Sequence, residues 1–203
     1  MVEARLQDVC GVLLCGGTGQ RLGGVDKPLL DGGNASLAQQ ALARLAGKLD
    51  EWVVSANRNR ARYAAFGHPV VADARTDEGP LAGIAAAAGA TEREWLYVQP
   101  GDAPAPDARL PAALRAQAGA HDALVARTGD RQQTLPLLVR RSCALALDAE
   151  LRNGLRAVHR WLASLDLAVI ELDVDMATWI NVNTPDELAA WRARSAVNEG
   201  AGA

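Results

Sequence analysis

The stretch LCGGTGQRLGGVDKPLL, residues 14–30, decides how the chain is interpreted. It begins at the end of the apolar segment Val9–Cys15, which predicts a buried β-strand. Glycines let a backbone approach a ligand closely and point its N–H groups at phosphate oxygens. The planar guanidinium of arginine and the compact ammonium group of lysine both suit a polyphosphate. The stretch contains one of each, Arg21 and Lys27. We therefore predict an anion-binding loop after the first strand, with the glycines Gly16, Gly17, Gly19, Gly23 and Gly24.

Two common glycine loops do not fit this stretch. A dinucleotide-binding GxGxxG motif that started at Gly17 would need a third glycine at Leu22. A P-loop would need adjacent glycine and lysine, whereas two residues separate Gly24 from Lys27. The sequence thus disfavours a nicotinamide dehydrogenase and a P-loop ATPase. The alternative of a surface turn with solvated charges is disfavoured because the glycines and both cations share one short segment.

The composition of the 203 residues suits one α/β domain, since 49% are hydrophobic and 22% are charged. We expect a single domain over residues 1–195 and a flexible C-terminal tail over residues 196–203. The net charge of −3 gives no general affinity for nucleic acid or for an anionic membrane. No signal peptide or membrane-spanning run is recognised, which predicts a cytoplasmic protein. The cysteines form no CxxC pair and are interpreted as buried apolar residues: Cys10, Cys15 and Cys143.

Short apolar segments alternate with helical patterns in the first half of the chain, which predicts a three-layer α/β/α architecture with a mostly parallel sheet. Extended segments are expected at Val9–Cys15, Trp52–Ser55, Val70–Val71, Trp95–Val98, Ala123–Ala126, Leu135–Val139, Ala168–Leu172 and Trp179–Val182. Helices are expected at Leu37–Leu49, Arg60–Phe66, Gly79–Ala90, Leu110–Ala118, Ser142–Leu151 and Leu155–Leu165. Thr184, Pro185 and Glu187 form a strong start signal for a last helix.

In a parallel sheet, ligands bind beyond the carboxyl ends of the strands, near the point where the strand order reverses. Residues 16–27, Asn57, Asp73 and Asp102 each follow an expected strand, so we expect them to line one edge. The three single residues are also typical of turns after strands, which is the structural alternative. Asp26 is interpreted either as a second acidic neighbour of the site or as a paired surface charge.

Several further motifs follow the glycine-rich stretch in a fixed order. They are Ser55–Arg58, Val71–Asp73, Gly79–Gly83, Pro100–Pro104 and Asn181–Leu188. Together with the signature LCGGxxxRLGGVDK at residues 14–27, they resemble the molybdenum cofactor guanylyltransferase (MobA) family. The resemblance extends over nearly the whole chain and is specific because the motifs occur in combination. It implies the nucleotide-diphospho-sugar-transferase fold, which is Rossmann-like.

The resemblance implies a Mg²⁺-dependent nucleotidyltransferase that joins the GMP part of GTP to Mo-molybdopterin and releases pyrophosphate. It implies Asp102 as the Mg²⁺ ligand and places Arg21, Lys27 and Asp102 in the catalytic group. The GTP-binding residues that it implies are Leu14, Cys15, Gly16, Gly17, Lys27, Asn57, Asp73 and Asp102.

The pterin side of the site is implied at Asn181 and Asn183, again by resemblance. Three residues depart from those that are usual in the family: Cys15, Pro28 and Gly101. None of these departures removes a charged group, so they concern the shape of the loops rather than the chemistry.

Two alternative functions remain open. The first is a related enzyme on the same fold, either a molybdopterin cytidylyltransferase or a sugar-phosphate nucleotidyltransferase. The pair Gly16–Gly17 favours guanine by resemblance, since the related cytidylyltransferases usually have Ala-Gly there. The second is a non-catalytic adaptor that passes on molybdopterin, which would not need Arg21, Lys27 and Asp102 together. Proteins that deliver molybdopterin or mature molybdoenzymes are expected as partners.

Overall fold

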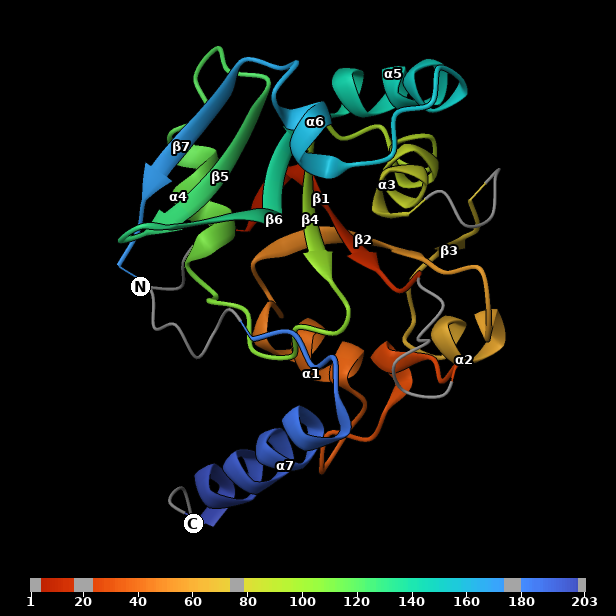
Figure 1. The fold of residues 1–203 in the computed structure, drawn as a ribbon, viewed down its shortest axis with the longest axis vertical. Helices are drawn as coiled ribbons and strands as arrows, with labels where there is room; N and C mark the ends of the chain where they lie inside the picture. Colours follow the sequence, from red (N-terminus) through yellow and green to blue (C-terminus); the bar gives the residue numbers. More distant parts are fainter. Residues whose placement is uncertain (1–4, 17–23, 74–78, 174–179, 201–203) are drawn as a thin grey trace.

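The centre of the molecule is a seven-stranded sheet with strand order β3-β2-β1-β4-β6-β5-β7 (Figure 1). The computed structural model describes residues 5–16, 24–73, 79–173 and 180–200. β6 runs antiparallel to β4 and β5, whereas the other neighbouring strands pair in parallel, so the expected mostly parallel sheet is confirmed. The strands are β1 (Leu6–Leu14), β2 (Leu49–Ser55), β3 (Val70–Val71), β4 (Trp95–Pro100), β5 (Ala123–Thr128), β6 (Arg131–Arg140) and β7 (Leu167–Glu171).

Helices cover both faces of the sheet, which confirms the expected three layers. Side chains of β1 alternate between two cores: Val9 and Leu13 enter one, and Cys10 and Val12 enter the other. Residues of α1, α2 and α4 close the first core, and residues of α3, α5 and α6 close the second. The helices are the 3₁₀ turn η2 (Lys27–Leu29), α1 (Leu37–Arg44), α2 (Arg60–Ala64), α3 (Pro80–Ala88), α4 (Leu110–Ala116), α5 (Arg141–Arg152), α6 (Val158–Leu162) and α7 (Pro185–Gly200).

The point where the strand order reverses lies between β1 and β4. The chain runs outward from β1 through β2 to β3, and β4 then returns to the other side of β1. The carboxyl ends of β1 and β4 are joined by a hydrogen bond of 2.9 Å from the Gly101 N–H to the Leu14 carbonyl. An added Cβ at Gly101 would lie 2.9 Å from both the Leu14 oxygen and the Cys15 Sγ. Glycine therefore allows the two strand ends to approach at this edge.

The first long helix begins where the sequence indicates but ends earlier than expected. Ser36 caps α1 through a capping box with Gln39. The expected end at Leu49 is wrong, because Gly47 adopts a left-handed conformation (φ +76°) and the chain enters β2 at Leu49. In the second half of the chain, α6 is also shorter than the expected helix at 155–165.

The expected strand at Trp179–Val182 is wrong in its described part, since residues 180–183 have no regular structure. Val182 is a fully buried loop residue, and it packs in a small core with Leu37 and Leu188. Its N–H donates to the Asp102 carbonyl over 2.9 Å. The extended appearance of this segment thus reflected burial rather than strand pairing.

The last helix, α7, lies beside α1 beyond the carboxyl edge of the sheet (Figure 1). The indole N–H of Trp191 donates to Gln40 Oε1 over 3.0 Å. α7 continues to Gly200 and so includes the first residues of the segment that the sequence assigned to a C-terminal tail. Among the helices of the described residues, none has the length and apolar character needed to cross a membrane.

Candidate active site

The end of β1 provides a closely held backbone at the switch point. The Cys15 N–H donates to the Ser55 carbonyl over 2.8 Å, and the Cys15 side chain is buried. Burial raises the pKa of its thiol well above the usual value, so Cys15 packs as a neutral apolar residue, as expected. Gly16 is exposed, and an added Cβ there would meet no atom within 4 Å. The expected site residues Gly17 and Arg21 lie outside the described residues.

Lys27 and Asp102 come together at this edge. Lys27 opens the turn η2, and Asp102 follows β4 directly. Burial raises the pKa of the Asp102 carboxyl, and the positive charge of Lys27 acts against this rise. The two groups therefore interact electrostatically across the ends of β1 and β4. A cation and a carboxylate at a switch point are suited to bind a charged ligand and its counterion.

Asn57 and Asp73 form a reciprocal pair beyond β2 and β3. Asn57 Nδ2 donates to Asp73 Oδ2 over 2.8 Å, and the Asp73 N–H donates to Asn57 Oδ1 over 2.9 Å. The Ser55 hydroxyl donates to Asp73 Oδ1 over 3.3 Å. Burial raises the pKa of Asp73, while the two side-chain hydrogen bonds lower it. Helix α3 approaches this corner closely, since an added Cβ at Gly83 would lie 2.5 Å from the Ser55 Oγ.

A buried glutamine, which sequence reasoning missed, shapes the turn that contains Asp102. Gln99 has no exposed surface. Its Nε2 donates over 3.2 Å to the carbonyls of both Pro100 and Ala103, on either side of Asp102. The Tyr97 hydroxyl donates to Gln99 Oε1 over 3.3 Å. A polar residue inside an apolar strand was the available signal, because a buried amide requires partners.

Asp26 is buried, so its interpretation as a surface charge is wrong. The residue is 8% exposed, and its side chain accepts hydrogen bonds from the Tyr63 hydroxyl (2.6 Å) and from Asn59 Nδ2 (2.9 Å). Its backbone carbonyl accepts the Leu29 N–H over 3.0 Å. These bonds thus attach Asp26, which directly precedes Lys27, to α2. Tyr63 and Asn59 lie more than 30 positions away in the chain, so no local pattern indicated these contacts.

We expect Tyr63→Phe to destabilise the fold, because it removes one of the two side-chain donors to a buried carboxylate. Hydrogen bonds to charged groups contribute about 1.5–3 kcal/mol, and the free energy of unfolding in urea should fall by that amount. Tyr97→Phe is the matched control, since that hydroxyl donates to a neutral amide and should contribute only about 1 kcal/mol. Equal losses in the two variants would contradict the larger contribution expected of the hydrogen bond from Tyr63 to Asp26.

The C-terminal segment contacts the ammonium group of Lys27 and the backbone of Asp102. Lys27 Nζ donates to Asn183 Oδ1 over 2.9 Å. Asn183 Nδ2 in turn donates to the Asn181 carbonyl over 3.2 Å, and Asn181 is exposed. The neighbouring Val182 N–H binds the Asp102 carbonyl. The two asparagines assigned to the pterin side therefore lie next to the residues assigned to GTP.

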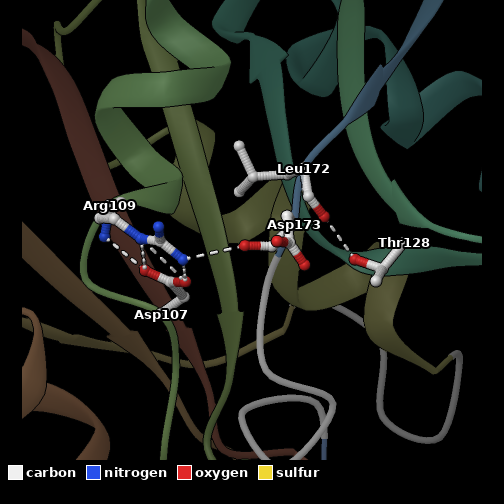
Figure 2. Close-up of polar contacts among 5 residues, drawn as sticks. All are labelled: Asp107, Arg109, Thr128, Leu172 and Asp173. Carbon is white, nitrogen blue, oxygen red and sulfur yellow. Dashed lines mark hydrogen bonds and ion pairs between the residues drawn. The ribbon is translucent and has the colours of Figure 1, made fainter.

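A second polar network lies at the ends of β5 and β7. Figure 2 shows Arg109 bound to both carboxylate oxygens of Asp107 and to the Asp173 carbonyl. The Thr128 hydroxyl donates to the Leu172 carbonyl over 2.6 Å. The Arg109 guanidinium holds the pKa of Asp107 below its usual value. This network connects the start of α4 to the chain that leaves β7, which is a structural role.

The donor set of the edge limits which metal it suits. Within the described residues, no group of three or more His, Cys, Asp or Glu side chains is placed to hold a metal ion. The carboxylate of Asp102 offers hard oxygen atoms at the switch point. Mg²⁺ binds through one or two carboxylates and takes its other ligands from water and phosphate. The residues present therefore fit Mg²⁺ that arrives with a polyphosphate, and do not fit a structural zinc site.

Similar proteins with known sequences extend over most of the chain. A protein of Ectopseudomonas mendocina (strain ymp), named molybdenum cofactor guanylyltransferase, is 39% identical over 89% of this chain and 90% of its own. A protein of Shewanella sp. (strain MR-4) with the same name is 36% identical over 87% of this chain and 91% of its own.

Solved structures share the fold at lower identity. Molybdopterin-guanine dinucleotide biosynthesis protein A from Archaeoglobus fulgidus superposes with a TM-score of 0.77 at 21% identity, over 92% of this chain and 98% of that one. The profile of the MobA-like NTP transferase domain matches residues 11–168, which is more than half of the chain. With these matches, the chain belongs to the MobA-like NTP transferase family and, within it, to the molybdenum cofactor guanylyltransferases.

Proposed function

We propose that this protein transfers the GMP part of GTP to Mo-molybdopterin, forming molybdopterin guanine dinucleotide and pyrophosphate. The observation that carries the proposal is that Lys27 and Asp102 are held by neighbouring residues at the switch point between β1 and β4: Asn183 binds Lys27 Nζ, and the Val182 N–H binds the Asp102 carbonyl. The names of its relatives identify the substrates of such an enzyme. A cytoplasmic location, and partner proteins that deliver molybdopterin or receive the product, belong to the same proposal.

The reaction requires positioning and neutralisation of charge more than covalent catalysis by the protein. A terminal phosphate of molybdopterin attacks the α-phosphorus of GTP in line, the bond from this phosphorus to the β-phosphate oxygen breaks, and pyrophosphate leaves. Lys27 stabilises the negative charge that grows on pyrophosphate, together with Arg21 from the glycine-rich loop. Asp102 holds Mg²⁺, which supplies further neutralisation of the phosphate oxygens when it is bound.

The nucleoside is assigned to the groups beside the phosphate site. The carboxylate of Asp73 has more lone pairs than its two side-chain donors use, so it accepts a hydrogen bond from a ribose hydroxyl while Asn57 fixes its orientation. The Cys15 N–H is already bound to Ser55, so the backbone that reads the guanine edge begins at the Cys15 carbonyl and the exposed Gly16.

Base selectivity is tested by equilibrium binding in the presence of Mg²⁺. We expect GTP to bind more tightly than CTP, ATP or UTP, because its O6 acceptor and N1–H donor match a backbone amide and carbonyl. Isothermal titration with the four nucleotides measures the difference. Parity among the nucleotides would contradict guanine selectivity, and preference for CTP would favour a cytidylyltransferase.

The transfer itself is tested by incubating the protein with Mo-molybdopterin, Mg²⁺ and α-labelled GTP. We expect the label in a dinucleotide product together with one pyrophosphate per transfer. A chelator added at the start should abolish the product. If labelled product fails to form although GTP binds, the adaptor function is favoured over the enzyme.

A further inference from the structure

The carboxylate of Glu187 organises the start of α7. Its Oε2 accepts the backbone N–H groups of Asn183 (2.7 Å) and Thr184 (2.9 Å). The Glu187 N–H donates to the Thr184 hydroxyl over 3.2 Å, which completes the capping box. A capping box needs only the bond to Thr184, so the bond to Asn183 is an additional one. Glu187 thus also binds the backbone of Asn183, the residue before Thr184.

That additional residue is the one that binds the Lys27 side chain. Asn183 Oδ1 accepts from Lys27 Nζ over 2.9 Å, and Asn183 Nδ2 is oriented by the Asn181 carbonyl. The backbone hydrogen bond from Asn183 lowers the pKa of Glu187, and the charge of Lys27 lowers it further. Asn183 therefore bonds to both groups: its backbone N–H donates to the Glu187 carboxylate, and its side-chain oxygen accepts from the Lys27 ammonium.

Residue 182 and helix α7, which flank Asn183, are fixed by further contacts. Val182 is fully buried and binds the Asp102 carbonyl through its N–H. On α7, Trp191 binds Gln40 of α1, and Arg192 Nε donates to the Asp31 carbonyl over 2.9 Å. The second turn of α7 is thus connected to α1 and to Asp31, and Val182, just before α7, is connected to the Asp102 turn.

We propose that Glu187 is a positioning residue, which fixes Asn183 so that the Asn183 amide oxygen directs the Lys27 ammonium toward the Asp102 edge. A lysine has a flexible stem of four carbons, and pinning one of its three donors leaves two for phosphate oxygens. Position 187 thereby makes α7 part of the active site, although it lies 160 positions from Lys27. The kinetic part of this inference rests on the proposed function.

The substitutions Glu187→Ala and Glu187→Gln separate the hydrogen bonds from the charge. Ala removes the acceptor for two N–H groups, and we expect kcat for dinucleotide formation to fall by about 10–100-fold, as misplaced reacting groups do, with a smaller change in KM for GTP. Gln retains a side-chain carbonyl oxygen and should restore most of the rate. Thr184→Ala is the matched control, because it weakens the helix cap but leaves the bond between Glu187 and Asn183.

A double-mutant cycle identifies the route of the effect. If Glu187 acts through Asn183, then Glu187→Ala has no further effect on kcat in the Asn183→Ala background. Additive losses, a parental rate for Glu187→Ala, or an equal loss for Thr184→Ala would each overturn the proposal.

Labelling of Lys27 tests the geometry without any substrate. Acetylation of the protein by acetic anhydride, followed by peptide mass spectrometry, measures the reactivity of the Lys27 amine. We expect faster acetylation in Glu187→Ala and in Asn183→Ala, and the parental rate in Glu187→Gln and Thr184→Ala. Unchanged reactivity in Glu187→Ala would refute the positioning role, whereas an inactive parent with the expected reactivity pattern would refute only the proposed function.

Discussion

Asp102→Asn is expected to abolish transfer of GMP and yet leave the protein at least as stable as the parent. The amide has nearly the same shape as the carboxylate but lacks the negative charge that interacts with Lys27 and that we propose holds Mg²⁺. We expect kcat to fall by roughly three powers of ten, the upper range for loss of one electrostatic contact in an active site. The assay is formation of the labelled dinucleotide from α-labelled GTP.

The stability part of this prediction follows from the pKa shift. Burial raises the pKa of Asp102, so the folded chain binds this proton more tightly, and stability falls as pH rises from the unfolded pKa through the folded one. At neutral pH the ionised carboxylate therefore costs stability, and Asp102→Asn removes that cost. Thermal unfolding at pH 7 with a chelator present should show an equal or higher Tm.

Asp107→Asn is the control with the opposite sign. The guanidinium of Arg109 lowers the pKa of Asp107, so its ionised form stabilises the fold above the unfolded pKa and loses this contribution as pH falls through the folded pKa. Asp107→Asn should therefore lower Tm at pH 7 while kcat is retained.

For Asp102→Asn, turnover near that of the parent would contradict the prediction, because it would mean that Asp102 is not the metal ligand that we propose.

Lys27→Ala is expected to lower kcat by two to three powers of ten. In the proposed mechanism the ammonium stabilises charge on the leaving pyrophosphate, and such a contact contributes roughly 3–4 kcal/mol to the transition state. The loss should appear mainly in kcat, because the charge grows as the bond breaks. Single-turnover kinetics with labelled GTP separates this step from nucleotide binding.

Lys27→Met distinguishes the charge from the packing of the stem. Methionine retains an unbranched apolar side chain but cannot donate to Asn183 or to phosphate. We expect the same loss of kcat as for Lys27→Ala. A rate near that of the parent in either variant would place the ammonium group in solvent during the reaction.

Much of the fold was predictable because its signals are local. The apolar runs at Val9–Cys15 and Trp95–Val98 became the central strands β1 and β4, and the pattern at Thr184 to Glu187 became a capped helix. Such patterns concern residues within one or two helical turns, so a single sequence contains them. The early end of α1 had a signal as well, since Gly47, in a left-handed conformation, lies between the end of the helix at Arg44 and the start of β2.

The antiparallel placement of β6 between β4 and β5 had no comparable signal. An apolar run such as 135–139 is equally consistent with either strand direction, and its neighbours are decided by how the helices pack on both faces. The same limitation applied to residues 180–183, where burial of Val182 resembled a strand pattern. A sequence shows that a residue is apolar and suited to burial, but it does not show which residues will cover it.

The candidate site likewise combines features that the sequence shows with features that only the tertiary structure shows. The sequence by itself determined which groups are available: a glycine-rich stretch that contains Lys27, and the carboxylates Asp73 and Asp102, which follow expected strands. Only the tertiary structure decided that Asp26 turns inward to Tyr63 and that Asn183 binds Lys27. The physical reason is separation along the chain, because contacts over 37 and 156 positions depend on strand order and helix packing rather than on local pattern.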